Sequence, residues 1–436
     1  MMNQAEVVFE GSKVQQGVLA LRPSMNLRTG EDNLRAAFGK PTSLEKDLLI
    51  LASSVFACDL AFKRGEREGI IRKIKLKIPI VNYASLESVR REILYALYLL
   101  SHDAWDIEFT RYEGTPEANQ IWGQERDSKI LLFSGGLDSF AEAVNLGYSG
   151  EQIHLVSHLT GNQNISRCQT SLFEYLNATF PSQFSRTSVR VGGVNRTPDE
   201  YPFPTDQARE ETQRTRSFLF LTLAGIAARR IGVKDVIMIA ENGQLAIHLP
   251  LTAARISAFS THTAHPEFIE IMANILRAVL SFDIRINNPF LYMTKSEVVR
   301  TIQRDEATMV PNTISCWMSA RITGGYTHCG ACIPCIIRRI ANESNGIMIN
   351  EYSRGILSED IAKLDPNDTG RRNFIELAEF VKFFRTANSQ AQILNAYPEL
   401  VNDAFDTGRA IDMYRRFALE ASQVFSAYPN LASIVS

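Results

Sequence analysis

The sequence predicts an α/β protein whose centre is a doubly wound parallel sheet. The main observation is a regular alternation of strand-like and helix-like segments that begins at Lys129 and continues to Arg304. Continuous apolar runs separated by amphipathic helices are typical of parallel strands covered on both faces. The flanking segments do not follow this rhythm. We therefore expect an N-terminal α+β accessory domain over residues 1–127, the α/β domain over 128–345, and a C-terminal helical extension over 346–436.

The expected elements follow from the spacing of the apolar residues. The N-terminal elements are helices over Leu44–Phe62 and Leu86–Leu100 and strands over Ile71–Ile80 and Asp106–Phe109. The central strands are Lys129–Ser134, Gln152–Leu159, Ser188–Val191, Val236–Ala240 and Asp283–Ile286. The central helices are Ser139–Leu146, Ser166–Phe180, Asp206–Ile231, Pro266–Leu280 and Thr294–Arg304. The C-terminal helices are Arg372–Arg385 and Ala410–Ala427. Ligands of such sheets lie beyond the carboxyl ends of the strands, so the loops there should converge on one cleft.

Composition and charge narrow the class of protein. The chain has 46 Lys and Arg residues against 48 Asp and Glu residues, so no global field favours nucleic acid or an anionic membrane. No apolar stretch approaches the roughly 20 residues that span a bilayer. The first residues lack the basic start and apolar core of a secretory signal. We therefore expect a cytoplasmic protein with no membrane partner, and the composition does not indicate a nucleic-acid partner.

A glycine-rich turn follows the first central strand. Its residues are Ser134, Gly135, Gly136, Leu137, Asp138 and Ser139. The glycines let the backbone approach a phosphate closely, the serines add hydroxyl donors, and the helix that follows points N–H groups and its dipole at the same spot. The aspartate suits a polyanion site if it holds Mg²⁺. No Gly-Lys-Ser/Thr follows, so the turn is not a Walker A loop. It resembles the PP-loop of ATP pyrophosphatases, which implies that ATP is split into AMP and pyrophosphate.

Four of the six cysteines form a cluster. Cys316, Cys329, Cys332 and Cys335 have the spacing C-x12-C-x2-C-x2-C. Four thiolates brought together by such short steps predict a closed, structural Zn²⁺ site. An iron–sulfur cluster or disulfides are the alternatives. His328 lies beside the cluster, and we expect it to be a neighbour and not a ligand.

The loop and the cysteine cluster together resemble the QueC family of 7-cyano-7-deazaguanine synthases. Arg216-Ser217-Phe218-Leu219 and Thr294-Lys295-Ser296-Glu297 resemble two further elements of that family, and the resemblance covers residues 128–340. It implies a ligase that adenylates 7-carboxy-7-deazaguanine with ATP. The expected catalytic residues are Asp138, Ser139, Arg216 and Lys295, the two basic side chains facing the phosphates. The expected substrate residues are His158, Glu241, Asn242 and Arg255. For each basic or substrate residue, a solvated or purely structural role is the alternative.

The chain also departs from simple deazaguanine enzymes, which are compact. The segments 47–52 and 101–109 resemble those of longer QueC-like proteins found in bacterial anti-phage systems, including Qat and one branch of CBASS. This resemblance implies that the activated deazaguanine is transferred to an amine of a partner protein. Free nitrile synthesis with ammonia, a non-catalytic nucleotide-binding scaffold and a tRNA-modifying PP-loop enzyme are the alternatives, and the balanced charge gives the last of these no support.

Overall fold

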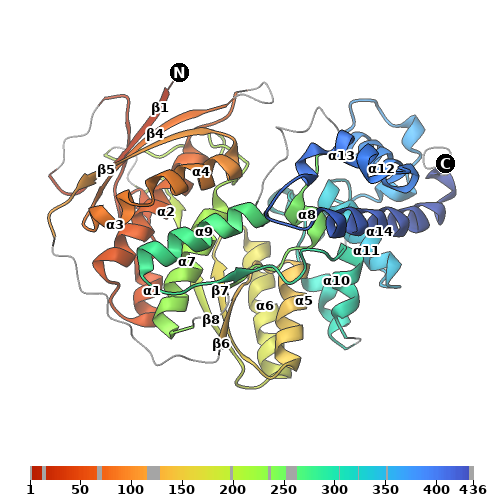
Figure 1. Ribbon diagram of the computed structural model, residues 1–436, viewed down its shortest axis with the longest axis horizontal. Helices are drawn as coiled ribbons and strands as arrows, with labels where there is room; N and C mark the ends of the chain where they lie inside the picture. Colours follow the sequence, from red (N-terminus) through yellow and green to blue (C-terminus); the bar gives the residue numbers. More distant parts are fainter. Residues whose placement is uncertain are drawn as a thin grey trace.

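The computed structural model describes residues 2–11, 16–65, 71–114, 128–196, 200–233, 237–251, 263–303, 305–322, 324–349 and 352–431. At its centre is a five-stranded parallel sheet with the order β11-β10-β6-β7-β8 (Figure 1). Its strands are β6 (Ser128–Leu132), β7 (Gln152–His158), β8 (Phe184–Val189), β10 (Ile237–Met238) and β11 (Ile286–Asn287). The strand order reverses at β6, which has β7 on one side and β10 on the other. In a doubly wound sheet this reversal marks the place where ligands bind.

Both faces of this sheet are buried. Ile130 and Leu132 of β6 belong to one hydrophobic core, whereas Leu131 and the following Phe133 belong to another. This alternation is that of a strand packed on both sides. The first core includes α7 (Arg216–Ile231) and α9 (Pro266–Leu280), together with N-terminal helices described below. The second includes α5 (Leu137–Tyr148), α6 (Gln163–Thr179) and α10 (Lys295–Thr301). The predicted doubly wound α/β fold is confirmed.

The N-terminal region contains a second parallel sheet, with the order β2-β1-β4-β5. Its strands are β1 (Met2–Val7), β2 (Leu19–Leu21), β4 (Lys73–Ile80) and β5 (Ala104–Arg111). Its helices are α1 (Glu31–Phe38), α2 (Ser43–Ala61), α3 (Tyr83–Glu87) and α4 (Arg90–Ser101). Because helices connect parallel strands, the region has α/β character, and the expected α+β arrangement is corrected.

The two sheets share one hydrophobic core, which includes α2, α4, α7 and α9. Helix α2 is buried on nearly every side, and its last residues approach the start of α7. A short antiparallel pair, β3 (Leu27–Arg28) with β9 (Gly192–Gly193), also joins the N-terminal region to the central domain. In Figure 1 the N-terminal region and the central sheet form one continuous body. The proposed division at residue 127 stays a prediction.

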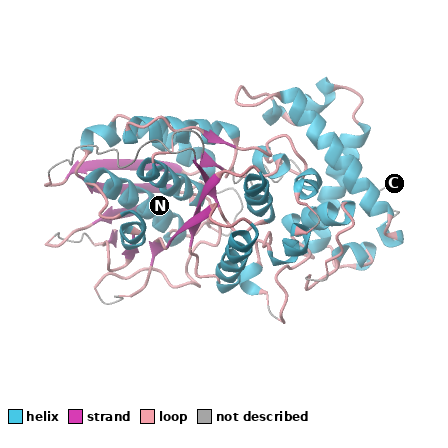
Figure 2. Cartoon of the chain, turned by 90° about the horizontal axis from the view of Figure 1, so that it is seen from below, coloured by secondary structure: helices cyan, strands magenta, loops and turns pink. Residues whose placement is uncertain are grey.

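The C-terminal region is helical, as expected, and has a core of its own. It lies at the opposite end of the molecule from the N-terminal sheet, as Figures 1 and 2 both show. Its helices are α11 (Ile333–Ser344), α12 (Thr369–Thr386), α13 (Gln390–Ala396) and α14 (Thr407–Ser426). The short helix α8 (Gly243–Ile247) of the central domain also contributes to this core. The 3-10 turns are Glu306–Asn312, Ser319–Arg321, Ile356–Ser358, Ile361–Lys363, Pro398–Leu400 and Pro429–Leu431. Within the described ranges, no helix is both long and apolar enough to cross a membrane.

Several predicted boundaries differ from the structure. The helix expected over Asp206–Ile231 begins only at Arg216. Before it, the backbone N–H groups of Thr212 and Thr215 donate to the carboxylates of Glu210 and Asp59 instead of entering a helix. The helix expected over Leu86–Leu100 is divided into α3 and α4. The strands expected over Ser188–Val191 and Asp283–Ile286 are shifted to β8 and β11, and the last central helix ends at Thr301.

Candidate active site

The glycine-rich turn connects β6 to α5 at the point where the strand order reverses. Gly135 has a φ of +80°, and a Cβ at this position would lie 3.0 Å from Cys168 Sγ and from Gln169 Cγ. Glycine is therefore required both for the conformation and for the space. Gly136 is the N-cap of α5, so the first N–H groups of this 12-residue helix point toward the loop. This is the arrangement of an anion site at a helix N-terminus.

The loop is held from three directions. The Ser134 hydroxyl accepts a hydrogen bond from Gly136 N (3.1 Å) and lies 3.3 Å from the Ser139 hydroxyl. Gly135 O accepts hydrogen bonds from Cys168 Sγ (3.0 Å) and from Ile314 N (3.0 Å). The backbone of the turn is thus fixed before any ligand binds, which lowers the entropy cost of binding a phosphate.

Asp138 is the centre of the polar cluster beside the loop. Lys295 Nζ lies 2.8 Å from each of its two carboxylate oxygens, and both side chains are buried. Asn242 donates to Asp138 Oδ2 from its backbone N (3.2 Å) and from Nδ2 (2.8 Å). Glu241 accepts a hydrogen bond from the same amide, at 3.1 Å. The structure thus brings together residues that follow β6 and β10 and a lysine from α10.

The two carboxyl groups of this cluster have different proton affinities. Burial alone would raise the pKa of Asp138, but Lys295 and hydrogen bonds from Glu241 and Asn242 hold this pKa below its usual value. Burial and the nearby Asp138 charge raise the pKa of Glu241 well above its usual value, against the opposing effects of Lys295 and Arg216. Asp138 is therefore the more acidic member of the pair, and Glu241 holds its proton more strongly.

Lys295 is positioned by residues of two other regions. It is the first residue of α10, and Thr294 and Glu297 form a capping box there. Its backbone N donates to Gln244 Oε1 at 2.6 Å. From α14 of the C-terminal region, Arg416 Nε donates to Glu297 Oε1 at 2.7 Å, and Glu420 accepts from the Thr294 hydroxyl at 3.1 Å. The C-terminal helices therefore support the start of α10.

Arg216 begins α7 and is supported by the N-terminal region. The residue as a whole is half-buried, and its guanidinium lies 5.7 Å from the ring centre of Phe220 and interacts electrostatically with Glu241. Burial lowers the pKa of Arg216. The residue before it, Thr215, donates to Asp59 Oδ2 of α2 from its backbone N (2.9 Å) and from its hydroxyl (3.1 Å).

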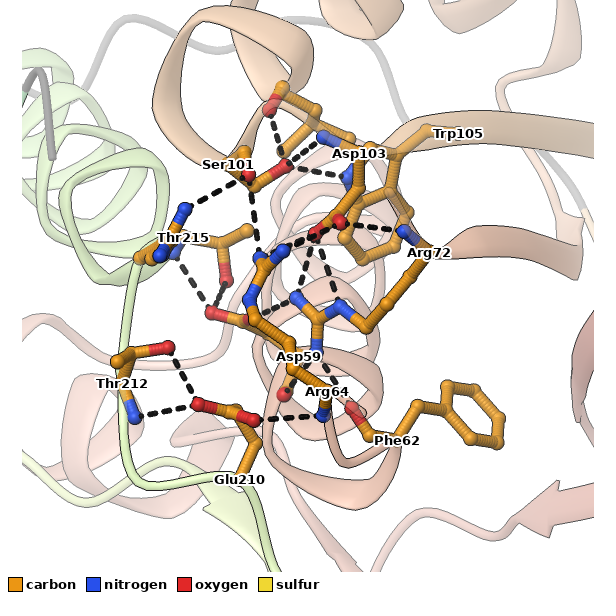
Figure 3. Close-up of polar contacts among 12 residues, drawn as sticks. Asp59, Phe62, Arg64, Arg72, Ser101, Asp103, Trp105, Glu210, Thr212 and Thr215 are labelled. Carbon is orange, nitrogen blue, oxygen red and sulfur yellow. Dashed lines mark hydrogen bonds and ion pairs between the residues drawn. The ribbon is translucent and has the colours of Figure 1, made fainter. Parts of the chain in front are cut away.

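Asp59 is part of a buried ion network (Figure 3). Arg72 lies between Asp59 and Asp103, with its Nη2 2.5 Å from Asp59 Oδ1 and 2.6 Å from Asp103 Oδ2. Arg64 also pairs with Asp103, at 2.6 Å. Figure 3 shows these side chains converging from N-terminal segments onto the loop that precedes α7. The network therefore fixes the backbone on which Arg216 stands.

The other two expected substrate residues, His158 and Arg255, are not among the hydrogen-bonded residues described above. His158 is buried between the rings of Phe56 and Phe220, and its Nε2 lies 3.2 Å from Val191 O. Burial lowers the pKa of His158 to about 4. Arg255 lies outside the described residues. A substrate role for either residue stays a prediction.

The four cysteines of the cluster, which we call the cysteine knuckle, lie together, as their spacing predicts. Their sulfur atoms are all within 4.8 Å of one another, and two of the separations are 3.9 Å (Cys316–Cys332) and 3.8 Å (Cys329–Cys335). Tetrahedral zinc with bonds of about 2.3 Å requires S···S separations of about 3.8 Å, so the geometry fits Zn²⁺. His328 accepts a hydrogen bond from Ser315 N through Nε2 and contacts the Thr327 hydroxyl through Nδ1. Both of its ring nitrogens are thus engaged away from the sulfurs.

Comparison with known proteins supports these features. The sequence model of the family described as "Queuosine biosynthesis protein QueC" matches residues 128–346, which is half of the chain. The chain belongs to the QueC family. The match includes the loop, Glu241, Asn242, Lys295 and the four cysteines.

Individual relatives match the same half. The 7-cyano-7-deazaguanine synthase of Rickettsia bellii is 26% identical over 231 residues, which cover 50% of this chain and 94% of the relative. The synthase of Thermoplasma acidophilum is 26% identical over 230 residues, covering 49% of this chain and 87% of the relative. The synthase of Rickettsia canadensis is 28% identical over 243 residues, which cover 50% of this chain and 95% of the relative. The QueC domain is therefore nearly complete here, and the rest of the chain is additional to it.

Sequence reasoning missed the residues that position the QueC site from outside the loop. Gln244 holds the Lys295 backbone, and Asn288 holds the loop after β10 by donating to Glu241 O (2.7 Å) and accepting from Glu241 N (3.2 Å). Their partners lie about fifty residues away in the sequence. No local pattern identifies such contacts, although Asn288 does follow a predicted strand at the carboxyl edge of the sheet.

Proposed function

We propose that this protein is an ATP-dependent ligase that activates 7-carboxy-7-deazaguanine and joins it to an amine of a partner protein. In the first step a carboxylate oxygen of the deazaguanine attacks the α-phosphorus of ATP. The bond from that phosphorus to the α–β bridging oxygen breaks, and pyrophosphate leaves. In the second step the amine nitrogen attacks the acyl carbon, AMP leaves with the bonding electron pair, and the amine loses a proton. The product is an amide.

The observation that carries this proposal is the polar cluster at the reversal of the strand order. Backbone N–H groups of the loop at the start of α5 suit the departing pyrophosphate. Lys295 lies beside that loop, and its ammonium suits the charge that builds up on the bridging oxygen. Arg216 adds a second cation close to Glu241. Stabilisation of that charge is the main task of an enzyme that transfers a phosphoryl or adenylyl group.

The carboxyl groups of Asp138 and Glu241 also suit Mg²⁺. Both carboxyl groups accept a hydrogen bond from the same Asn242 amide, so they lie close together and offer the hard oxygen ligands that this ion prefers. Mg²⁺ bound there would neutralise phosphate charge, and Asn242 and Lys295 would keep the Asp138 carboxylate in place. The knuckle would hold Zn²⁺ in a structural role, because four sulfurs leave no open position.

Two regions outside the QueC domain favour a protein acceptor. Residues 2–114 and the C-terminal helices both contact elements that carry site residues, through Asp59–Thr215 and through Arg416–Glu297. The match to the two relatives already uses 94% and 87% of their length, so little of either relative is left to correspond to these two regions. We assign these regions to recognition of the partner, in a bacterial anti-phage defence system of the kind that the N-terminal segments resemble.

The competing activity is free nitrile synthesis with ammonia, which the names of the relatives favour. To separate the two, the full chain is incubated with ATP, Mg²⁺ and 7-carboxy-7-deazaguanine, together with either ammonium chloride or the proteins that co-purify with it. The proposal predicts that intact-mass spectrometry finds a co-purified protein heavier by one deazaguanine acyl group. Formation of pyrophosphate and nitrile with ammonium, and no gain in mass on any protein, would reject the protein acceptor and support the competing activity.

A further inference from the structure

A large cleft lies between the N-terminal region and the central sheet. It has a volume of about 940 Å³ and is lined by residues that follow strands of both parallel sheets. Pro79 and Tyr112 lie at the carboxyl ends of β4 and β5, and Leu159 and Arg190 directly follow β7 and β8. Carboxyl ends of parallel strands are where α/β proteins bind their ligands, and this cleft combines two such edges.

Three arginines gather on one wall of the cleft. Arg28 lies on β3, whose pairing with β9 sets it opposite Gly192 and close to Arg190 and Arg196. Burial and the positive charges of Arg196 and Arg190 lower the pKa of Arg28. Within the described ranges, none of these three side chains forms an ion pair, and Arg190 and Arg196 are exposed. Like charges held together without a counter-charge indicate a site for an anionic ligand.

Three acidic residues line the cleft, and within the described ranges none of them forms an ion pair with Arg28, Arg190 or Arg196; Asp32 is exposed, and the other two have partners of their own. Glu31 pairs with Arg35 at 2.7 Å and with Lys46 at 3.3 Å. Asp47 accepts hydrogen bonds from Val81 N (3.1 Å) and Asn82 N (2.7 Å). These carboxylates are part of the fold, and their contacts are separate from the arginine wall.

The distance between the active site and the arginine wall, by which we mean Arg28, Arg190 and Arg196, limits the length of a ligand that could reach both. In the sheet, β8 lies two strands away from β6. At the usual spacing between strands, the distance from β6 to β8 is about 10 Å. The segment after β8 is held in place, because Asn33 Oδ1 accepts from Arg190 N at 3.1 Å. An extended peptide advances about 3.3 Å per residue, so three to five residues span the distance from the arginines to the loop after β6.

We propose that this cleft binds an acidic segment of the acceptor protein, about three to five residues from the amine that is modified. The inference rests on the protein-transfer function proposed above. A peptide fits better than nucleic acid because the cleft also presents apolar surface, including the half-buried Ile50 and Leu159, against which apolar side chains of a peptide can pack. The arginine wall thus selects the acceptor by its charge and directs its amine toward the activated deazaguanine.

The test measures binding of three fluorescein-labelled probes to the full chain by fluorescence anisotropy. The probes are a ten-residue peptide of alternating Gly and Glu, the same peptide with Gln for Glu, and a ten-nucleotide single-stranded DNA. We expect the Glu peptide to bind about tenfold or more tightly than the Gln peptide at 50 mM NaCl, and the difference to shrink at 300 mM. Equal affinity for the two peptides would overturn the proposal, and tighter binding of the DNA would replace it with a nucleic-acid surface.

Charge variants locate the binding site. The triple variant R28Q/R190Q/R196Q should bind the Glu peptide about tenfold more weakly, whereas the matched triple variant R91Q/R300Q/R372Q, which alters exposed arginines outside the cleft, should bind within about twofold of the parent. If the first triple variant does not fold, as judged by thermal unfolding, the single variants R190Q and R196Q each should weaken binding about twofold to fivefold. Unchanged binding in these variants would overturn the proposal.

A separate measurement distinguishes failure of the cleft from failure of the chemistry. ATP–pyrophosphate exchange by the unmodified chain depends on the deazaguanine carboxylate and not on the peptide. Exchange without preference for the Glu peptide would reject the cleft alone, and preference for the Glu peptide without exchange would reject the proposed chemistry.

Discussion

Replacement of Arg72 by Met should strongly destabilise the N-terminal region. Arg72 is 4% exposed and makes ion pairs of 2.5 Å with Asp59 and 2.6 Å with Asp103, and its Nη1 donates to Asp59 O (2.9 Å) and to Phe62 O (2.6 Å). The two aspartate side chains have no solvent exposure. Removal of one partner from a buried pair costs about 3–5 kcal/mol because the remaining charge has no compensation.

Urea unfolding of the full chain, followed by circular dichroism, measures the effect. A loss of this size shifts the urea midpoint by roughly 1–2 M at a slope of about 3 kcal/mol/M, since the slope increases with the size of the protein. The matched control is Arg90→Met, because Arg90 pairs with Glu87 at 3.3 Å with both side chains more than a third exposed. Such an exposed pair contributes less than about 1 kcal/mol. Equal midpoint shifts for the two variants would refute the assignment of the network as a buried support of α7.

The effect of Arg72→Met should also depend on pH. Burial would raise the pKa of Asp103, but Arg72 and Arg64 hold it below its usual value in the folded protein. A lowered pKa contributes stability that is present above the unfolded value of about 3.8 and is lost as the pH falls through the folded value. The difference between the parent and Arg72→Met should therefore be full at pH 7 and smaller at pH 3.

Three further predictions concern the site and its surroundings. Lys295→Ala should slow ATP–pyrophosphate exchange by about 10²–10³-fold, and the exposed control Lys363→Ala should leave it unchanged. Cys332→Ser should remove the bound zinc measured by mass spectrometry of the metal, whereas Cys58→Ala should retain it, since Cys58 is outside the cluster. Burial raises the pKa of Glu142 to about 7, so its contribution to stability is present at low pH and lost as the pH rises through 7. Glu142→Gln should therefore stabilise the protein against urea at pH 8 by roughly 1–3 kcal/mol and have little effect at pH 5.

The sequence predicted the central domain well because its signals are local. Apolar runs such as Ile130–Phe133 identify buried strands, and short cysteine spacing identifies the knuckle. The glycine turn was identified for the same reason, since Gly135 must have both a positive φ and no side chain.

The supports of the site could not be predicted in this way. The helix expected from Asp206 begins ten residues later because Asp59 and Glu210 bind the backbone of the intervening loop. Asp59 is separated from Thr215 by 156 residues, and Glu297 from Arg416 by 119. Hydrophobic periodicity contains no information about such distant polar pairs. It also did not indicate the parallel pairing of the N-terminal strands, because register and direction depend on which helices connect them.

We propose above all that the loop, Asp138 and Lys295 split ATP into AMP and pyrophosphate when the deazaguanine carboxylate is bound. The most direct test is exchange of radiolabelled pyrophosphate into ATP by the purified full chain, with and without 7-carboxy-7-deazaguanine. We predict exchange that requires the carboxylate and Mg²⁺ and that falls by at least about 10²-fold in Asp138→Asn. Exchange that is absent under all conditions, or undiminished in Asp138→Asn, would contradict the claim.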